Sequence, residues 1–233
     1  MIYAIGDLHF DSSEKKPMDI FGDNWIDHKD KIILDWEKRV GDDDLVLIPG
    51  DISWALKLNE AIVDLKLIDS LPGKKIFVKG NHDYWWEGIS RLKALGLDTI
   101  EFLRNSSYIY KNMAIVGTRG WTSRDSDGFD ESDEKIFKRE LLRLEASILS
   151  IGKEVDKKIA MLHYPPFNNK LQPNEFVDLL RAYKVDICIY GHLHADGHKY
   201  AIEGLVEGID FHLVASDYLD FELKLLLEEW LWN

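Results

Sequence analysis

The chain has 233 residues, of which 45% are hydrophobic and 12% aromatic, and this suits one domain with a sizeable core. Its 42 acidic and 29 basic residues give a formal net charge of −13. A field of that sign repels polyanions, so general nucleic-acid binding is not expected, although metal ions could let a local site accept a phosphate.

Cysteine content and hydropathy indicate the compartment. The only cysteine, Cys188, has no partner for an internal disulfide, which fits a reducing compartment. Residues 1–7 lack the basic region and cleavage site of a signal peptide, and no apolar run is long enough to cross a bilayer. We therefore expect a soluble, cytoplasmic protein without a membrane partner, and the sequence leaves its oligomeric state open.

The first part of the chain predicts alternating strands and helices. Short apolar runs predict strands, and apolar residues at helical spacing predict helices. In chain order the elements are a strand over 2–5, a helix over 24–40, a strand over 45–48, a helix over 59–71, a strand over 75–79 and a helix over 89–95. This alternation is typical of βαβ units, with helices on the faces of a sheet.

From residue 100 onward the pattern becomes richer in short strands. The runs predict strands over 100–102, 107–111 and 113–117, a helix over 131–149, a strand over 158–162, a helix over 175–183 and a strand over 185–190. Short antiparallel strands are expected over 199–201, 205–207 and 211–215, and the segment 221–227 fits a strand or a terminal helix. We find no repeat or linker, so a single domain over 1–233 is expected.

Five of the predicted strands end in polar residues that suit metal binding. These ends are Asp7-Leu8-His9, Gly50-Asp51, Gly80-Asn81-His82-Asp83, His163 and Gly191-His192-Leu193-His194, and they contain five of the eight histidines. Packing does not require polar residues to recur at strand ends, whereas ligands bind at the carboxyl edge of an α/β sheet. Imidazole and carboxylate donors without a thiolate favour a divalent ion such as manganese, iron or zinc.

The donors are too many for one ion, and a bridging carboxylate would let two ions sit roughly 3.5–4 Å apart, which suits phosphoryl chemistry. In their order and neighbours, the five motifs resemble those of the calcineurin-like metallophosphoesterase superfamily, and they extend from Asp7 to His194. The resemblance implies an α/β fold, a four-layered α/β/β/α sandwich of two mixed β-sheets flanked by helices, with a dinuclear centre at the strand ends.

The resemblance also implies a role for each motif residue. Asp7, His9 and His194 would bind one metal ion, Asn81, His163 and His192 would bind the other, and Asp51 would bridge the pair. A hydroxide bridging the metals would attack phosphorus, while His82, which is not a ligand, would assist the leaving group. The expected cofactor is two divalent ions, with manganese preferred to iron or zinc, and the expected substrate is a small phosphorylated molecule or a nucleotide.

Trp54 departs from the family pattern. Many protein phosphatases of the family place an aspartate three residues after the bridging aspartate, where it orients the catalytic histidine. Here Trp54 stands three residues after Asp51. This favours the broader bacterial-type phosphoesterases over a Ser/Thr protein phosphatase, and it leaves open which group orients His82.

The leading prediction is a phosphoesterase acting on a phosphomonoester or a phosphodiester. A cyclic-nucleotide phosphodiesterase is a second hydrolase with the same motif set. The competing class is a non-catalytic scaffold, because the superfamily includes a retromer subunit that kept the fold to bind partners. A scaffold would be expected to have lost a ligand or the histidine after Asn81, and this chain retains them all.

Several other residues could contribute to a substrate site. Trp54, Tyr84, Trp85 and Trp86 could line a pocket or pack in the core. Arg119 and Arg124 could hold a second phosphate or a nucleotide, although solvated loop arginines are the simpler interpretation. His198 follows His194 by four residues, but Gly197 and the β-like segment 199–201 argue against a helix there, so His198 is left out of the metal set.

Overall fold

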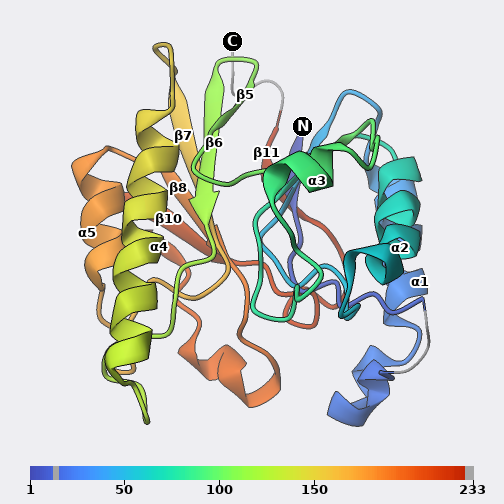
Figure 1. Ribbon diagram of the computed structural model, residues 1–233, viewed down its shortest axis with the longest axis horizontal. Coiled ribbons are helices and arrows are strands. Elements are labelled where there is room, and N and C mark those ends of the chain that lie inside the picture. Colours follow the sequence, from blue (N-terminus) through green and yellow to red (C-terminus); the bar gives the residue numbers. More distant parts are fainter. Residues whose placement is uncertain (13–15, 229–233) are drawn as a thin grey trace.

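The computed structural model describes residues 1–12 and 16–228. Figure 1 shows two β-sheets packed face to face. Helices from the first part of the chain cover the outer face of one sheet, and helices from the second part cover the other. None of the helices in the described ranges is long and apolar enough to cross a membrane.

The first sheet has the strand order β11-β1-β2-β3-β4. Strands β1 (Ile2–Ala4), β2 (Leu45–Ile48), β3 (Lys74–Phe77) and β4 (Ile100–Phe102) are parallel, and β11 (Lys224–Leu227) is antiparallel to β1. The connecting helices are α1 (His28–Arg39), α2 (Leu58–Ser70) and α3 (Ile89–Lys93). Two 3-10 helices, η1 (Met18–Phe21) and η2 (Asp23–Trp25), precede α1. The predicted βαβ units are therefore confirmed.

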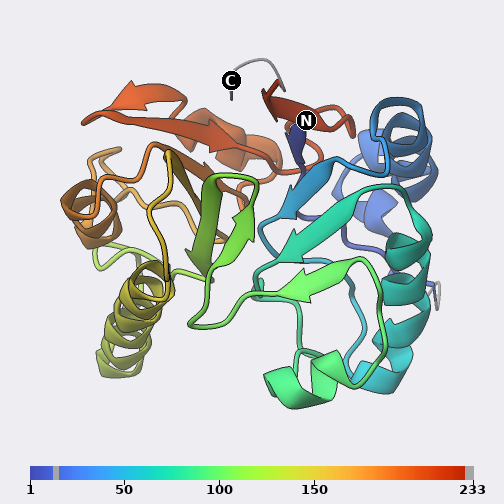
Figure 2. The ribbon, with the colours of Figure 1, turned by 90° about the horizontal axis from the view of Figure 1, so that it is seen from above.

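The second sheet has the strand order β5-β6-β7-β8-β10-β9. Strands β6 (Met113–Thr118), β7 (Lys157–Leu162), β8 (Ile187–Tyr190) and β10 (Ile209–Leu213) are parallel, while β5 (Tyr108–Tyr110) and β9 (Gly204–Val206) form antiparallel edges. Helices α4 (Glu131–Leu149) and α5 (Glu175–Ala182) cover its outer face, as Figure 2 shows from above. The side chain of Asp130 caps α4 by accepting hydrogen bonds from the backbone N–H groups of Ser132 and Asp133.

Strand alternation explains the layers. Leu45 and Leu47 of β2 pack between the two sheets, whereas Val46 and Ile48 pack against α1 and α2. The same alternation in the second sheet directs one face of each strand toward α4 and α5. Both sheets are thus buried on two sides, which is why their strands are continuous apolar runs. The expected four-layered α/β/β/α fold is confirmed.

The structure corrects the carboxyl-terminal prediction in two places. The segment 199–201, expected as a strand, falls largely within the 3-10 helix η3 (Ala195–Tyr200), where a bond from Ala201 N to His198 O closes the turn. Strand β10 pairs antiparallel with β9 as expected, but parallel with β8. The undecided segment 221–227 contains β11, which is a strand because it pairs with β1. The single-domain prediction also covers 13–15 and 229–233, which lie outside the described residues.

Candidate metal centre

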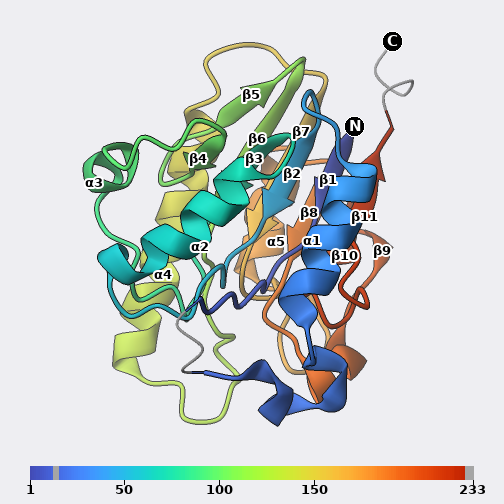
Figure 3. The same ribbon diagram turned by 90° about the vertical axis from the view of Figure 1, so that its right-hand side faces the viewer.

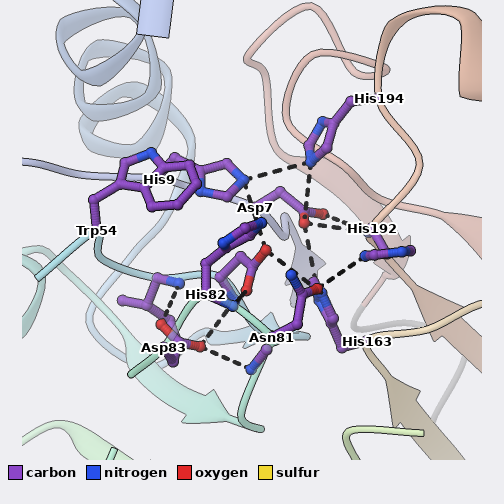
Figure 4. A network of polar contacts seen from close by, with 12 residues as sticks. Asp7, His9, Trp54, Asn81, His82, Asp83, His163, His192 and His194 are labelled. Carbon is purple, nitrogen blue, oxygen red and sulfur yellow. Dashed lines mark hydrogen bonds and ion pairs between the residues drawn. The ribbon is translucent and has the colours of Figure 1, made fainter. Parts of the chain in front are cut away.

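The carboxyl ends of β1, β2, β3, β7 and β8 meet at one edge of the sheets, and they bring the seven predicted ligands together (Figure 4). Within the first sheet, Asp7 N donates to Gly50 O (3.0 Å) and His9 N donates to Asp51 O (2.9 Å). Between the sheets, the backbone N–H of His192 donates to the carboxylate of Asp7 (3.0 Å), so the two sheets share one polar edge.

The backbone at this edge is strained. Asp7, His9, Asp51 and His192 have positive φ angles of 55°, 48°, 52° and 73°. Such angles are uncommon for residues with a Cβ, and they cluster at functional sites. A Cβ on Gly191 would collide with the carboxylate of Asp7, so only glycine permits this approach.

One group of donors consists of Asp7, His9 and His194. Nε2 of His194 lies 3.4 Å from Oδ1 of Asp7 and 3.4 Å from Nε2 of His9. All three ligand atoms lie within 4.8 Å of one another. This spacing would allow one ion to contact all three.

A second group consists of Asn81, His163 and His192. Oδ1 of Asn81 lies 2.6 Å from Nε2 of His163 and 2.9 Å from Nδ1 of His192. Nδ1 of His163 donates to the carbonyl of Pro49 (3.0 Å), which leaves its Nε2 lone pair directed into the centre.

Asp51 lies between the two groups. Its Oδ2 is 3.8 Å from Nε2 of His9 and 3.5 Å from Nε2 of His163. Its other oxygen accepts a hydrogen bond from the backbone N–H of His82 (2.8 Å). One carboxylate oxygen is therefore within reach of both donor groups.

The charges at the centre fit divalent cations. Asp7 and Asp51 are buried, and within the part of the chain that the structure describes no lysine or arginine lies at ion-pair distance from either carboxylate. Burial and the neighbouring Asp7 raise the pKa of Asp51 well above its usual range. Cations would supply the missing positive charge, so these nitrogen and oxygen donors fit divalent metal ions.

His82 lies beside the donors with its imidazole against Trp54, at 4.3 Å between ring centroids. Its ring forms no hydrogen bond to any of the described residues, and burial lowers the pKa of His82 to about 4. Trp54 also stacks on His9, with centroids 4.7 Å apart and 21° between planes. Trp54 is thus an aromatic wall that contacts both imidazoles.

Asp83 supports the loop that carries Asp51. It is fully buried and accepts hydrogen bonds from the backbone N–H groups of Asp51 (2.9 Å), Ile52 (2.9 Å), Ser53 (3.3 Å) and Gly80 (2.8 Å). This carboxylate therefore links the turns after β2 and β3. The sequence marked it as part of a motif but gave it no role.

Sequence reasoning missed Asp217. Its Oδ1 lies 2.7 Å from Nδ1 of His194, and its Oδ2 accepts a hydrogen bond from the backbone N–H of Ala195 and lies 3.2 Å from Nε2 of His198. Because Asp217 holds Nδ1–H of His194, the Nε2 atom is free to face the centre. The signal was present, since Asp217 follows a predicted strand over 211–215 just as the motif residues follow theirs.

The remaining candidates divide between core and surface. Trp85 and Trp86 are buried in the first apolar core, and Tyr84 is exposed. Arg124 is exposed, and its charge is neutralised by ion pairs with Glu134 and Glu175. Arg119 is half-buried, and its guanidinium lies over the ring of Trp121.

A family model described as calcineurin-like phosphoesterase matches residues 1–196. The chain therefore belongs to this family, whose members hydrolyse phosphoesters with the help of metal ions. The family, together with the group of Asp7, His9 and His194 and the group of Asp7, Asp51 and His163, in each of which the ligand atoms lie within 4.8 Å of one another, indicates divalent metal binding. A search of curated proteins finds no match.

The chain resembles 47 solved chains, among them the following three. The protein TT1561 of Thermus thermophilus has a TM-score of 0.55 and 11% identity, over 83% of this chain and 81% of that one. AQ665 of Aquifex aeolicus, a protein of unknown function, has a TM-score of 0.49 and 18% identity, over 96% and 94%. GAP50, the anchor in the inner membrane complex of Plasmodium, has a TM-score of 0.49 and 14% identity, over 92% and 71%. At its low identity, the likeness to TT1561 supports the fold alone.

Proposed function

We propose that the chain is a dinuclear metallophosphoesterase that acts on a small phosphorylated substrate. Asp7, His9 and His194 would hold one divalent ion, Asn81, His163 and His192 would hold the other, and Asp51 would bridge them. Bound there, the ions would supply the Lewis acidity that activates water and offsets charge on the phosphoryl oxygens. Nitrogen and oxygen donors fit manganese, iron or zinc, and manganese is our first choice among the three.

The position of Asp51 is the observation that carries this proposal. Its Oδ2 lies within 3.8 Å of a nitrogen in each donor group, as a bridging ligand must. The N–H groups of Ile52 and Ser53, bonded to Asp83, fix the loop that presents it. The carboxylate therefore needs little rearrangement to serve two ions at once.

His82 is the residue that would act on the leaving group. It is half-buried beside the donors, and no described residue accepts or donates a hydrogen bond at its ring. An imidazole without a protein partner can donate its ring N–H to the substrate's ester oxygen and stabilise the charge that develops there as the bond breaks. Trp54 limits the positions this ring can adopt.

The test compares hydrolysis of p-nitrophenyl phosphate and bis-p-nitrophenyl phosphate by chelator-stripped protein reconstituted with manganese. We expect two ions per chain and turnover that requires them. Preference for the diester would assign a phosphodiesterase, and preference for the monoester would assign a phosphatase. Two bound ions without turnover of either ester would contradict the proposal.

A matched pair of variants tests the bridge. We expect Asp51→Asn to lose both ions together, since a shared ligand couples the two sites. Asp42→Asn removes the same charge from an exposed position before β2 and should retain both ions. Loss of only one ion in Asp51→Asn would contradict the bridging role.

A further inference from the structure

A cavity of about 370 Å³ opens at the same carboxyl edge as the candidate metal centre. Residues at the carboxyl ends of β3, β4 and β6 line it, and α4 contributes its outer wall. Figures 2 and 3 show β4 beside the β5–β6 hairpin, where the edges of the two sheets meet. Small-molecule pockets have volumes of roughly 300–1,000 Å³, so the cavity suits a small ligand group.

The walls of this cavity, here named the cationic pocket, carry an unusual concentration of positive charge. The basic side chains are Lys79, Arg104, Arg119, Arg139 and Arg143. They face only two carboxylates, Glu87 and Glu140, and Glu87 also pairs with Arg91 outside the pocket. In a chain of net charge −13, this is a local field that attracts anions.

Ion pairs within the pocket do not neutralise all of these positive charges. Arg143 donates to Glu140 at 2.6 Å, and Arg139 lies 3.5 Å from the same carboxylate. Arg119 is 3.9 Å from it, which is too far for a hydrogen bond. Nε of Arg119 is buried without an acceptor among the described residues. In residues 1–12 and 16–228, neither Lys79 nor Arg104 has a carboxylate within 4 Å. Cationic side chains without a carboxylate partner and a buried donor without an acceptor lower the stability of the fold unless a bound anion pairs with them.

We propose that the cationic pocket binds a second anionic group, a phosphate or a carboxylate, of the substrate whose phosphoester is cleaved at the metal centre. This inference rests on the proposed function. Guanidinium groups bind phosphate and carboxylate oxygens through paired, charge-assisted hydrogen bonds. The preferred substrate is then a phosphoester with another negative group at its far end.

The pocket and the metal centre adjoin one another through two short stretches of chain. Lys79 in the pocket precedes Asn81 by two residues on the turn after β3. The carbonyl of Arg119 accepts hydrogen bonds from the backbone N–H groups of His163 (3.0 Å) and Tyr164 (2.9 Å). Because these contacts fix the pocket against the centre, one extended substrate can occupy both.

The experiment uses the manganese-loaded protein with alkanediol bisphosphates of increasing length and the matching monophosphates. We expect kcat/KM to favour a bisphosphate of one optimal length by about tenfold, a factor that one charge-assisted hydrogen bond can supply. Arg104→Gln combined with Arg139→Gln should remove this preference, mainly by raising KM. Lys138→Gln removes a charge from the neighbouring exposed position on α4, where Lys138 pairs with Glu134, and should keep the preference.

A binding measurement without metal separates this inference from the proposed function. Calorimetry with inorganic pyrophosphate and chelator-stripped protein should show binding that the double variant loses. If this binding is observed but no ester is hydrolysed, the pocket is supported and the proposed function is wrong. If esters are hydrolysed without any bisphosphate preference, the substrate subsite is overturned, and retained pyrophosphate binding would then identify a site for a free anion.

Discussion

The carboxylate of Asp217 lies 2.7 Å from Nδ1 of His194, although 23 residues separate them in the chain. Burial alone would lower the pKa of His194, but the carboxylates of Asp7 and Asp217 raise it to about 10 in the protein without metal. The hydrogen bond from Nδ1 to Asp217 fixes the orientation of His194, with Nε2 toward the other donors. Once a metal ion replaces the proton on Nε2, the same bond would keep the remaining proton on Nδ1.

Asp217→Asn should weaken metal binding. The amide keeps the size of the side chain but loses the charge that holds Nδ1–H of His194, and a change of this kind costs about 10–100-fold in metal affinity. Titration calorimetry with manganese measures the effect. Asp220→Asn changes an exposed acid three residues away and should bind manganese like the wild type. Equal affinities for the two variants would rule out the orienting role.

His82→Ala should abolish most turnover while leaving the metal content unchanged. The backbone N–H that bonds Asp51 is retained, whereas the imidazole that would assist the leaving group is lost. We expect kcat to fall by about 10²–10⁴-fold. Steady-state kinetics with metal analysis of the same sample checks both statements. Undiminished turnover would show that His82 has no part in the chemistry.

Asp83→Ala should destabilise the fold even without metal. The substitution leaves buried N–H groups of Asp51, Ile52 and Gly80 without an acceptor. Each unsatisfied buried donor costs about 1–3 kcal/mol, and partial relaxation should hold the loss of unfolding free energy to roughly 3–5 kcal/mol. Urea unfolding of chelator-stripped protein measures it. Asp98→Ala, at an exposed position before β4, is the control, and a similar small loss in both variants would contradict the linking role.

Lys75 gives the protein a pH-dependent stability. Its side chain is fully buried, and its ammonium donates to the carbonyls of Leu71 and Asp69 and to Oγ1 of Thr99 (2.9 Å). Burial lowers the pKa of Lys75 to about 8, although the carboxylates of Asp69 and Asp42 act in the opposite direction. The unfolded chain, with a pKa of about 10.4, then binds more protons than the native state above pH 8.

Stability should therefore rise with pH between about 8 and 10.4, by roughly 1–3 kcal/mol from this residue. Urea unfolding at both ends of this range, in wild type and in Lys75→Met, isolates the contribution as the difference between the two slopes. Lys74→Met alters the exposed neighbour on β3 and should keep the wild-type slope. An unchanged slope in Lys75→Met would show that the ammonium is not the cause.

Local patterns in the sequence predicted most of the elements and the residues at the candidate centre. Apolar runs such as 45–48 can only be stable when buried, and the polar residues that follow them must lie where the strands end. Asp7, Asp51 and His163 were identifiable for this reason, without knowledge of how the strands pair. The four layers came from the family resemblance, and the apolar clusters of the structure confirm them.

Tertiary structure alone decided what depends on partners distant in the chain. The segment 221–227 contains a strand where it pairs with β1, and 199–200 belongs to a 3-10 helix whose last turn is closed by the bond from Ala201 N to His198 O. Asp217 acts on His194, and Arg104 and Arg139 line one cavity, only because separate elements pack together. The local sequence indicates which segments are buried. Which strands pair, and which charged side chains gather, depends on the free energy of the whole packed chain.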